Sequence, residues 1–366
     1  MTNLVDPSVC VGQTATGTDP QAQAPVLGLE AEDSLELRLL NDYQRDFPLC
    51  QAPYARIAEQ LDVTSSRVLA RLASWIHTGI VSRIGAVLRP GTVGASTLCA
   101  MQVPEHRLEE VAARISAQPA VNHNYEREHR FNLWFVAAAQ DAACLGQIVS
   151  RIEAGCGLAA LRLPLVREFL LDLGFALDGS RTVRSPRRLP QAESARPCLD
   201  ASDRQLLAAL QGGLALVERP FAVLAQQAGW SGAQGERLAL TRIDSLLNQG
   251  VIKRFGVIVR HRALGFHANA MCVWDVPEDR VGILARRLVR EHGITLCYER
   301  ARAGAIWPYN LYCMIHGRDR RLVQAQLHSL CSRLGLAAYR GEVLFSKRAF
   351  KQCGANYFDA GSATHG

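Results

Sequence analysis

Apolar residues recur at helical spacing in three short segments near the start of each half of the chain. The pattern predicts helices over residues 34–42, 54–61, 65–77, 201–210, 220–228 and 235–249. A proline stands at the first turn of each middle helix and a glycine follows each last one, as is typical of helix starts and ends. Alternating segments follow at 80–88 and 251–259. This order predicts a winged helix-turn-helix in each half.

Each half then continues in the order strand, helix, strand, strand, helix, strand. The expected strands lie at 96–103, 120–125, 132–138 and 161–166 in the first half and at 267–276, 294–300, 309–316 and 337–344 in the second. The expected helices lie at 105–117, 142–154, 279–291 and 320–334. This order predicts a ferredoxin-like sandwich, so the expected fold class is α+β.

The two halves repeat one another. Tyr125-Glu126-Arg127 returns as Tyr298-Glu299-Arg300, and the spacing between matching residues grows in small steps along the chain. A tandem duplication with loop insertions produces this pattern, and we expect the halves to pair as a pseudo-dimer. The expected segments are a disordered tail (1–33), winged helix (34–92), ferredoxin-like domain (93–176), linker (177–198), winged helix (199–264), ferredoxin-like domain (265–353) and C-terminal tail (354–366).

Charge and cysteine content narrow the class of protein. The net charge of +7 suits an anionic partner, either nucleic acid or a polycarboxylate. Eleven cysteines occur without a C-x-x-C pair, which favours buried thiols in a reducing cytoplasm over zinc ligands or disulfides. No apolar run is long enough for a membrane helix, and the N-terminus lacks the pattern of a secretory signal. We therefore expect a cytoplasmic protein without a membrane partner.

Three motifs are more specific than the helix-turn-helix. N-Y-E-R-E-H at 124–129 is followed by N-L-W-F-V, C-Y-E-R at 297–300 is followed by W-P-Y-N-L-Y-C-M-I-H-G, and V-I-K-R-F-G-V-I-V-R-H-R begins at 251. Within a winged helix and α/β architecture of the Lrp/AsnC type, these motifs resemble the Lrp/AsnC-like sirohaem decarboxylases. The tandem form resembles the fused D–L subunit of the haem d1 biosynthesis branch, and the likeness covers about residues 34–350.

The resemblance implies a carboxy-lyase that removes two acetate carboxylates from sirohaem to give 12,18-didecarboxysirohaem. It implies no cofactor and no protein-bound metal, since the only iron belongs to the sirohaem substrate. The implied partners are sirohaem and its decarboxylated products. Homologous decarboxylase subunits and a homo-oligomer stay open as further partners, and DNA is not expected.

The residues themselves suit this chemistry. Strand alternation puts His123, Tyr125, Arg127 and His129 on one face, with Trp134 near enough to pack against a macrocycle. Decarboxylation leaves electron density on a methylene carbon, so a proton donor is needed, and His is the side chain best poised for that near neutral pH. We expect His123, His129 and Arg127 to be catalytic. The alternative is a solvated strand end with His129 in a turn.

Arginines pair bidentately with carboxylates, so the other cations near this face are expected to bind substrate. The second half keeps Tyr298 and Arg300 but has Leu296 in place of His123 and Arg302 in place of His129, which predicts a binding face without an imidazole. Asn269 and Trp274 are expected to be structural. Tyr125 and Trp134 join the expected binding set, and the wings add Arg83, Arg89, Arg254, Arg260 and His261, the last also a candidate iron ligand or acid.

Two other functions compete with a decarboxylase. A DNA-binding regulator would use the recognition helices 65–77 and 235–249, which offer Arg67, Arg71, Arg237 and Arg242. The W-S-G-A-Q-G insertion at 230–235 is expected to lengthen the turn before the second of these helices, and two divergent helices suit a symmetric operator poorly. A non-catalytic tetrapyrrole sensor or carrier would use the same binding face as the enzyme.

Overall fold

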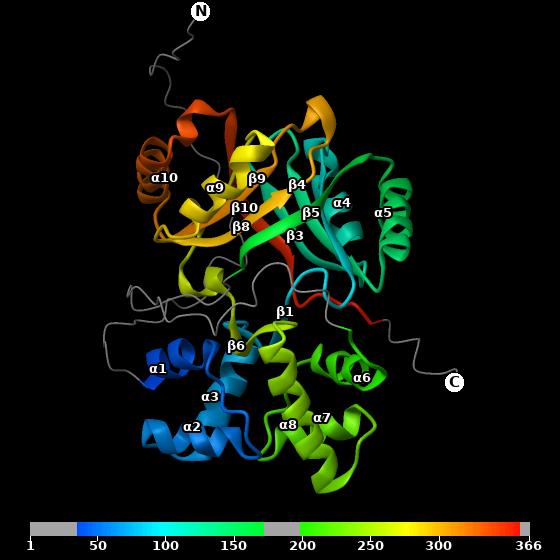
Figure 1. The fold of residues 1–366 in the computed structure, drawn as a ribbon, viewed down its shortest axis with the longest axis vertical. Helices are drawn as coiled ribbons and strands as arrows, with labels where there is room; N and C mark the ends of the chain where they lie inside the picture. Colours follow the sequence, from blue (N-terminus) through cyan, green and yellow to red (C-terminus); the bar gives the residue numbers. More distant parts are fainter. Residues whose placement is uncertain (1–34, 172–197, 359–366) are drawn as a thin grey trace, which may run out of the picture.

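The computed structural model describes residues 35–171 and 198–358, apart from the side chain of residue 261. Figure 1 shows two lobes, one built of helices and one built of strands with helices on its outer faces. The strands β1 (Val81–Leu88) and β6 (Ile252–Val259) lie between the lobes. No helix in the described ranges is long and apolar enough to cross a membrane.

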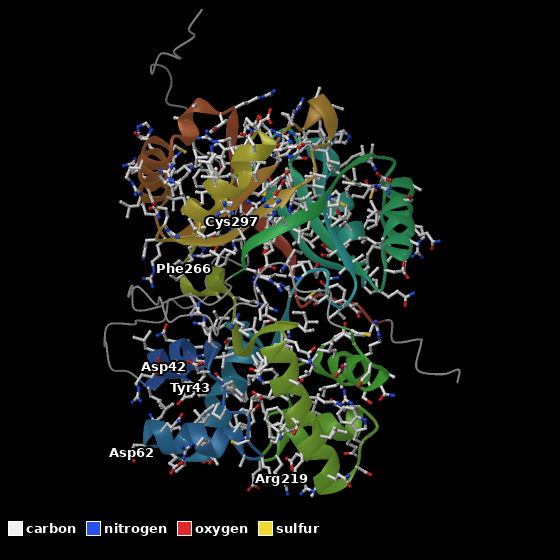
Figure 2. All side chains as sticks on the ribbon, in the orientation of Figure 1. Asp42, Tyr43, Asp62, Arg219, Phe266 and Cys297 are labelled. Carbon is white, nitrogen blue, oxygen red and sulfur yellow. The ribbon has the colours of Figure 1, made fainter. Side chains whose placement is uncertain are left out.

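The helical lobe combines both halves of the chain. Its helices are α1 (Leu35–Asn41), α2 (Pro53–Leu61), α3 (Ser65–His77), α6 (Ala201–Leu210), α7 (Pro220–Gln227) and α8 (Gly232–Asn248), so the predicted helices are confirmed with small shifts at their ends. Asp62 ends α2 in the left-handed conformation, with φ of 55° (Figure 2). Thr64 then caps α3 by accepting a hydrogen bond from the backbone of Arg67. Leu72 and Phe221 lie in one shared apolar core.

The turn before α8 is not lengthened as the sequence predicted. Helix α8 begins at Gly232, so most of the inserted residues form its first turn. The Trp230 N–H donates to the carbonyl of Ala225 at 2.8 Å, and a Cβ on Gly235 would lie 2.9 Å from the Trp230 carbonyl carbon. The glycine-rich composition therefore allows the helix to pack directly on its own preceding turn.

The two wing segments pair with each other. Strands β1 and β6 form a two-stranded antiparallel sheet in which Gly85 lies opposite Gly256. A Cβ on Gly256 would lie 2.3 Å from the Tyr43 carbonyl oxygen, so only glycine allows the helical lobe to approach this closely. Each wing therefore finds its partner strand in the other half of the chain.

The strand lobe is a closed eight-stranded barrel. Its strands are β2 (Ala95–Met101), β3 (Val121–Arg127), β4 (Leu133–Ala139), β5 (Ala160–Leu171), β7 (Ala268–Trp274), β8 (Ile294–Arg300), β9 (Leu311–Gly317) and β10 (Gly341–Gln352), in the order β10-β3-β4-β2-β5-β8-β9-β7. Four helices cover the outside: α4 (Leu108–Ser116), α5 (Ala142–Cys156), α9 (Glu278–Leu288) and α10 (Arg320–Leu334).

Two strands join the halves. Strand β5 pairs with β2 along residues 160–164 and with β8 of the other half along 165–171. Strand β10 pairs with β7 along 341–345 and then with β3 of the first half along 346–352. Both closing strands extend past their predicted ends, because the second part of each one pairs with a strand from the other half.

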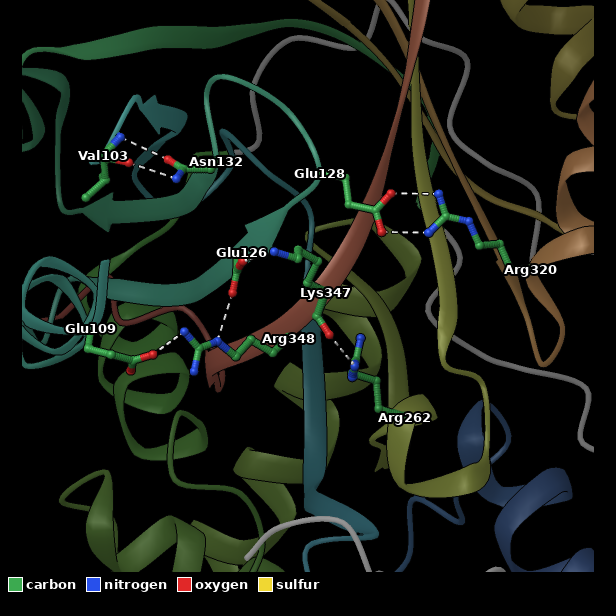
Figure 3. A network of polar contacts seen from close by, with 9 residues as sticks. All are labelled: Val103, Glu109, Glu126, Glu128, Asn132, Arg262, Arg320, Lys347 and Arg348. Carbon is green, nitrogen blue, oxygen red and sulfur yellow. Dashed lines mark hydrogen bonds and ion pairs between the residues drawn. The ribbon is translucent and has the colours of Figure 1, made fainter. Parts of the chain in front are cut away.

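Ion pairs fix the seam between β10 and β3 (Figure 3). The Glu126 carboxylate lies 2.7 Å from Lys347 Nζ and 2.9 Å from Arg348 Nε, and Glu128 pairs with Arg320 through two contacts of 2.6 Å. Such partly exposed pairs stabilise by ~1 kcal/mol or less each. These ion pairs fix the register of β10 against β3, the strand that carries His123, Tyr125 and Arg127.

The barrel interior is filled at the end away from the helical lobe. Trp134, Trp307, Tyr309 and Tyr312 pack there, with ring centroids of Trp307 at 5.1 Å from Trp134 and 4.9 Å from Tyr309. The Trp307 N–H donates to the Tyr312 hydroxyl at 2.6 Å. Trp307 lies between Arg300 and Asn310, a stretch that is five residues longer than the matching stretch between Arg127 and Asn132. The extra segment of the second half therefore supplies an aromatic plug. The opposite end of the interior is open.

Candidate active site

A cavity of about 350 Å³ occupies the open end of the barrel, facing the two-stranded sheet. This volume lies in the range of small-molecule sites. Both halves line it, and Trp134 and Tyr312 of the aromatic plug form part of its wall. Apolar wall positions include Leu98, Val136, Leu165, Ile258, Met271, Leu296 and Met314. Residues after β10 also contribute, among them Cys353, Gly354 and Tyr357.

Arginine dominates the charge of this cavity. Among the described residues that line it, the charged side chains are all arginines: Arg83, Arg127, Arg254, Arg260 and Arg300. No aspartate, glutamate or lysine is among those described lining residues. Several cations around one half-enclosed space favour a ligand that carries several negative charges. The predicted binding residues Tyr125, Tyr298 and Trp134 line the same space.

Arg127 and Arg300 occupy matching places at the two seams of the barrel. Arg127 Nη1 donates to the carbonyl of Leu344 at 3.0 Å, and Arg300 Nη1 donates to that of Leu163 at 2.9 Å. Burial lowers the pKa of Arg127 to about 10, so its guanidinium is charged at neutral pH. Arg127 Nε is buried and has no hydrogen-bond partner within residues 35–171 and 198–358. Each guanidinium therefore closes a seam of the barrel and also lines the cavity.

The wing arginines divide into two groups. Arg83 Nη2 donates to the Ala86 carbonyl at 3.1 Å, while the Nε atoms of Arg83 and Arg260 are buried without a hydrogen-bond partner. Within the described structure, Arg83 and Arg260 therefore each keep an Nε donor that is available to a ligand. Arg254 is 7% exposed, and its Nη1 donates to the carbonyl of Gln44 at 2.5 Å, which braces the wing against the helical lobe.

Arg89 is not among the described residues that line the cavity, so the structure does not bring it together with the other predicted wing arginines. Strand β1 ends at Leu88, and its pairing with β6 shifts register between Val87 and Leu88. Arg89 therefore lies just beyond the end of the strand that carries Arg83. Residue 261 begins a 3-10 helix (His261–Leu264), and its side chain lies outside the described part of the structure, so its proposed ligand role is not addressed.

His123 lies on the cavity wall as the alternation predicted, in line with Tyr125 and Arg127. Its ring is 6.0 Å from that of Tyr125, and its Nδ1 atom is buried with no hydrogen-bond partner in the described part of the chain. Burial, and secondarily the charge of Arg83, lower the pKa of His123 to about 4. Without a ligand this imidazole is therefore neutral at pH 7.

His129 does not lie in the cavity, so the prediction that it shares this face is wrong. Strand β3 ends at Arg127, and the His129 N–H donates back to the Arg127 carbonyl at 2.9 Å, so the chain has already turned. His129 Nε2 lies 2.7 Å from Glu342, and its Nδ1 accepts the N–H of Phe131 at 3.0 Å. His129 thus lies in the turn, as the alternative predicted, but it is 15% exposed and paired with Glu342, so it is not solvated as that alternative expected.

The second half does contribute an imidazole. His316 on β9 lines the cavity, with Nδ1 2.8 Å from the hydroxyl of Thr295. The prediction that the second half lacks an imidazole is therefore wrong, because it rested only on the positions that match His123 and His129. Strand alternation could have predicted this position, because Tyr312, Met314 and His316 are every second residue of the Y-C-M-I-H-G sequence and all three line the cavity.

Asn269 also belongs to the cavity, against the expectation that it is structural. It is 3% exposed, lies opposite His316 in the pairing of β7 with β9, and neither amide atom has a hydrogen-bond partner among the described residues. Buried amides are normally satisfied, so a bound ligand is the natural partner. Trp134 lines the cavity while its indole N–H donates to the Phe131 carbonyl at 2.6 Å.

The described residues contain no group of three or more His, Cys, Asp or Glu side chains arranged to hold a metal ion. The ten cysteines in the described ranges are free thiols. The prediction of buried thiols is confirmed for Cys99, Cys272 and Cys313, whereas Cys144 is only half-buried. The arrangement can thus bind a polyanion through arginines, place tyrosine and tryptophan rings against it, and exchange protons through two imidazoles.

Comparison with known proteins identifies related chains. The "AsnC-like ligand binding domain" matches residues 92–169 and 263–351, and the "Siroheme decarboxylase NirDL-like HTH domain" matches residues 36–81 and 203–253. The siroheme decarboxylase NirDL subunit of Paracoccus denitrificans is 45% identical over 323 residues, which is 88% of this chain and 97% of that one. The siroheme decarboxylase of Hydrogenobacter thermophilus is 30% identical over 322 residues, covering 88% of this chain and 94% of that one.

A solved structure shows the same fold. The crystal structure of the siroheme decarboxylase NirDL in co-complex with an iron-uroporphyrin III analogue matches with a TM-score of 0.61 and 28% identity, covering 87% of this chain and 92% of that one.

Proposed function

The chain belongs to the AsnC-like sirohaem decarboxylases of the NirDL type, and on that premise we propose that it removes carboxylate groups from sirohaem. The observation that carries the proposal is the cavity with five arginines and no acidic residue among its described lining. Sirohaem is a flat polycarboxylate, which fits a cationic space walled by aromatic rings. We infer the specific product 12,18-didecarboxysirohaem, formed in haem d1 biosynthesis by loss of two acetate carboxylates.

The arginines bind the carboxylates that stay on the macrocycle. Arg127 and Arg300 enter from opposite halves, and Arg83 and Arg260 enter from the wings, so the ligand is held from several sides. Charge-assisted pairs of this kind are short and directional, which fixes the position of the macrocycle as well as its affinity. The apolar wall formed by Leu98, Val136 and Met314 offers a place where a departing carboxylate is not stabilised by a cation.

The reaction needs one proton for each carboxylate lost. The bond between the methylene carbon and the carboxylate carbon breaks, the electron pair stays on the methylene carbon, and a proton forms the new methyl group while CO₂ leaves. His123 is the proposed proton donor on the first wall. It is neutral in the free protein, so a bound carboxylate must first raise its pKa. No cofactor takes part, and the iron is carried by the substrate.

The recognition helices support this choice over DNA binding. Arg71 of α3 pairs with Glu36 at 2.8 Å, and Arg242 of α8 lies 2.9 Å from Asp200 and 2.7 Å from Asp203. Cations held by neighbouring carboxylates contribute little to phosphate binding. The remaining predicted contacts, Arg67 and Arg237, are too few for a groove-reading surface.

The proposal extends to architecture and setting. A tandem repeat of winged helix-turn-helix and ferredoxin-like units, paired as a pseudo-dimer, is supported by the shared helical core and by the strands β5 and β10 that close one barrel from both halves. The free thiols support a reducing cytoplasmic setting. Homologous subunits are further proposed partners, since the relatives include chains named as NirD and NirL subunits.

Anaerobic incubation with sirohaem followed by mass analysis tests the proposal. Loss of two CO₂ per macrocycle is expected from the parental chain, and a double variant Arg127→Gln/Arg300→Gln should show little conversion. Arg67→Gln, on the outer face of α3, is the matched arginine control. Bound but unchanged sirohaem would establish a sensor or carrier instead. Tight sequence-specific binding of a DNA duplex without any conversion of sirohaem would establish a regulator.

A further inference from the structure

The two walls of the cavity, one from each half of the chain, share a tyrosine and an arginine. Tyr125 and Arg127 on β3 correspond to Tyr298 and Arg300 on β8, and all four line the cavity. Because the two arginines occupy matching places, they bind a carboxylate equally well on either wall. These residues therefore do not distinguish one edge of a flat polycarboxylate from the other. That choice falls to positions at which the walls differ.

Asn269 is one such position. It lies on β7, where strand alternation places it on the interior face with Met271, and both residues line the cavity. The matching residue of the first half is Ser96 on β2, at the same spacing that separates Tyr125 from Tyr298. Ser96 lines the cavity as well, so the first wall has a hydroxyl where the second wall has an amide.

The two matching side chains differ in their hydrogen bonds. The Ser96 side chain hydrogen-bonds the Tyr357 hydroxyl, and the backbone N–H of Tyr357 donates to Gln211 Oε1 at 2.9 Å. Asn269 is 3% exposed, and neither Nδ2 nor Oδ1 has a hydrogen-bond partner among the described residues. A buried amide without partners costs free energy, so its presence on a cavity wall indicates a ligand that supplies them.

Asn310 shows what a structural amide looks like in this protein. It is 2% exposed, its Oδ1 accepts the N–H of Val276 at 2.9 Å, and its Nδ2 donates to the Val276 carbonyl at 2.9 Å. Asn132 makes the same two contacts with Val103 in the first half. The fold uses both ends of these two amides, and they occur in both halves. Asn269 differs from them in both respects.

We propose that Asn269 is a specificity-determining residue, whose Nδ2 donates to a carboxylate that stays on sirohaem and thereby selects one orientation of the macrocycle. The inference rests on the proposed function. The matched arginines bind carboxylates in either orientation, whereas this amide is present on one wall only. In the reversed orientation the carboxylates that leave and those that stay exchange places, so the macrocycle is bound but wrongly placed for reaction. Oδ1 accepts from a water molecule that accompanies the bound carboxylate.

The test measures binding and single-turnover decarboxylation of sirohaem by Asn269→Leu under anaerobic conditions. Leucine has a similar size and shape but cannot hydrogen-bond. Binding should weaken by ~10–100-fold, the range for a lost hydrogen bond to a charged group. Conversion should split into a fast phase at the parental rate and a slow phase, because part of the bound sirohaem starts reversed. The parental chain should convert sirohaem in one phase.

Asn310→Leu is the matched control for stability, because it removes an equally buried amide that has both partners. It should lower the midpoint of urea unfolding of the free protein. Asn269→Leu should leave that midpoint unchanged or raise it, because an amide without partners is removed. Asn269→Ser, which introduces the residue of the other wall, should also give two-phase conversion and an unchanged midpoint.

Two results would overturn the inference while leaving the proposed function intact. One is parental affinity and one-phase conversion by Asn269→Leu. The other is a lowered urea midpoint in both Asn269→Leu and Asn269→Ser, on the scale of Asn310→Leu, which indicates a structural amide. If the parental chain leaves sirohaem unchanged, the proposed function itself fails.

Discussion

Binding of sirohaem should make the protein take up a proton at His123. In the free protein the pKa of His123 is about 4, because the ring is buried and Arg83 lies near it. At pH 7 only ~0.1% of such a group is protonated. An acid that donates a proton to carbon must carry one, so the bound substrate has to supply the missing stabilisation. The perturbation that isolates this effect is His123→Gln, which keeps a polar side chain but cannot titrate.

A single substrate carboxylate can supply the free energy needed to raise the pKa of His123. Raising the pKa of His123 from about 4 to ~7 takes ~4 kcal/mol, at 1.36 kcal/mol per pKa unit. A carboxylate ~4 Å from an imidazolium contributes ~4 kcal/mol at an effective dielectric constant of ~20. Pairing of Arg83 with another carboxylate adds to the effect by removing its repulsion. About half a proton should therefore be taken up at pH 7, rising towards one at pH 6.

Calorimetric titration in buffers of different ionisation enthalpy measures this uptake directly. The titration is run anaerobically with sirohaem at pH 6 and at pH 7, with the parental chain and with His123→Gln. The slope of binding enthalpy against buffer ionisation enthalpy gives the number of protons, and the difference between the two chains isolates His123 from any other group. Equal slopes for parent and variant would refute the assignment of His123 as the proton donor.

Four further outcomes follow from the structure. Arg127→Gln should weaken sirohaem binding by at least tenfold and reduce its salt dependence in titrations at two ionic strengths, because a buried charge-assisted contact is lost. His129→Ala should keep near-parental turnover in the mass assay while lowering stability by about 1 kcal/mol, because it pairs with Glu342 away from the cavity; a large loss of turnover would return it to the site. Trp307→Ala should destabilise by ~3–5 kcal/mol in urea unfolding, since it is 1% exposed in the aromatic plug. The folded pKa of His123 lies below the unfolded value of ~6.5, so the parent should lose stability as pH falls from ~6.5 towards 4; in His123→Gln the slope should be smaller by up to one proton, ~1.36 kcal/mol per pH unit.

Local periodicity predicted one wall of the site well. Alternation along a strand places every second side chain on one face, and His123, Tyr125 and Arg127 do share the cavity. The same rule failed at His129, because it holds only while the strand lasts. The Arg127 N–H donates to the Asn132 carbonyl at 2.8 Å, which closes the hairpin there. The length of a strand depends on such pairings, and the pattern of residue types does not record them.

The rest of the site depends on contacts between distant segments. The meeting of Arg83 with His123 requires β1 to pair with a strand from the other half, and no sequence period specifies that pairing. The seam contacts of Arg127 and Arg300 likewise arise where β10 and β5 cross into the other half of the barrel. Comparison of the two halves found what they share. It could not find His316, which has no counterpart to be matched.

The barrel closed by β5 and β10 draws both walls of its interior from one polypeptide. In an assembly of two identical chains, every substitution appears twice, related by a twofold axis. A fused chain is free of that constraint, and evolution can alter one wall while conserving the other. Leu296 and Ala138 stand where the opposite walls carry histidines, so the symmetry of the ancestral pair has been broken inside the cavity. A macrocycle whose edges are not equivalent can then be recognised in one orientation.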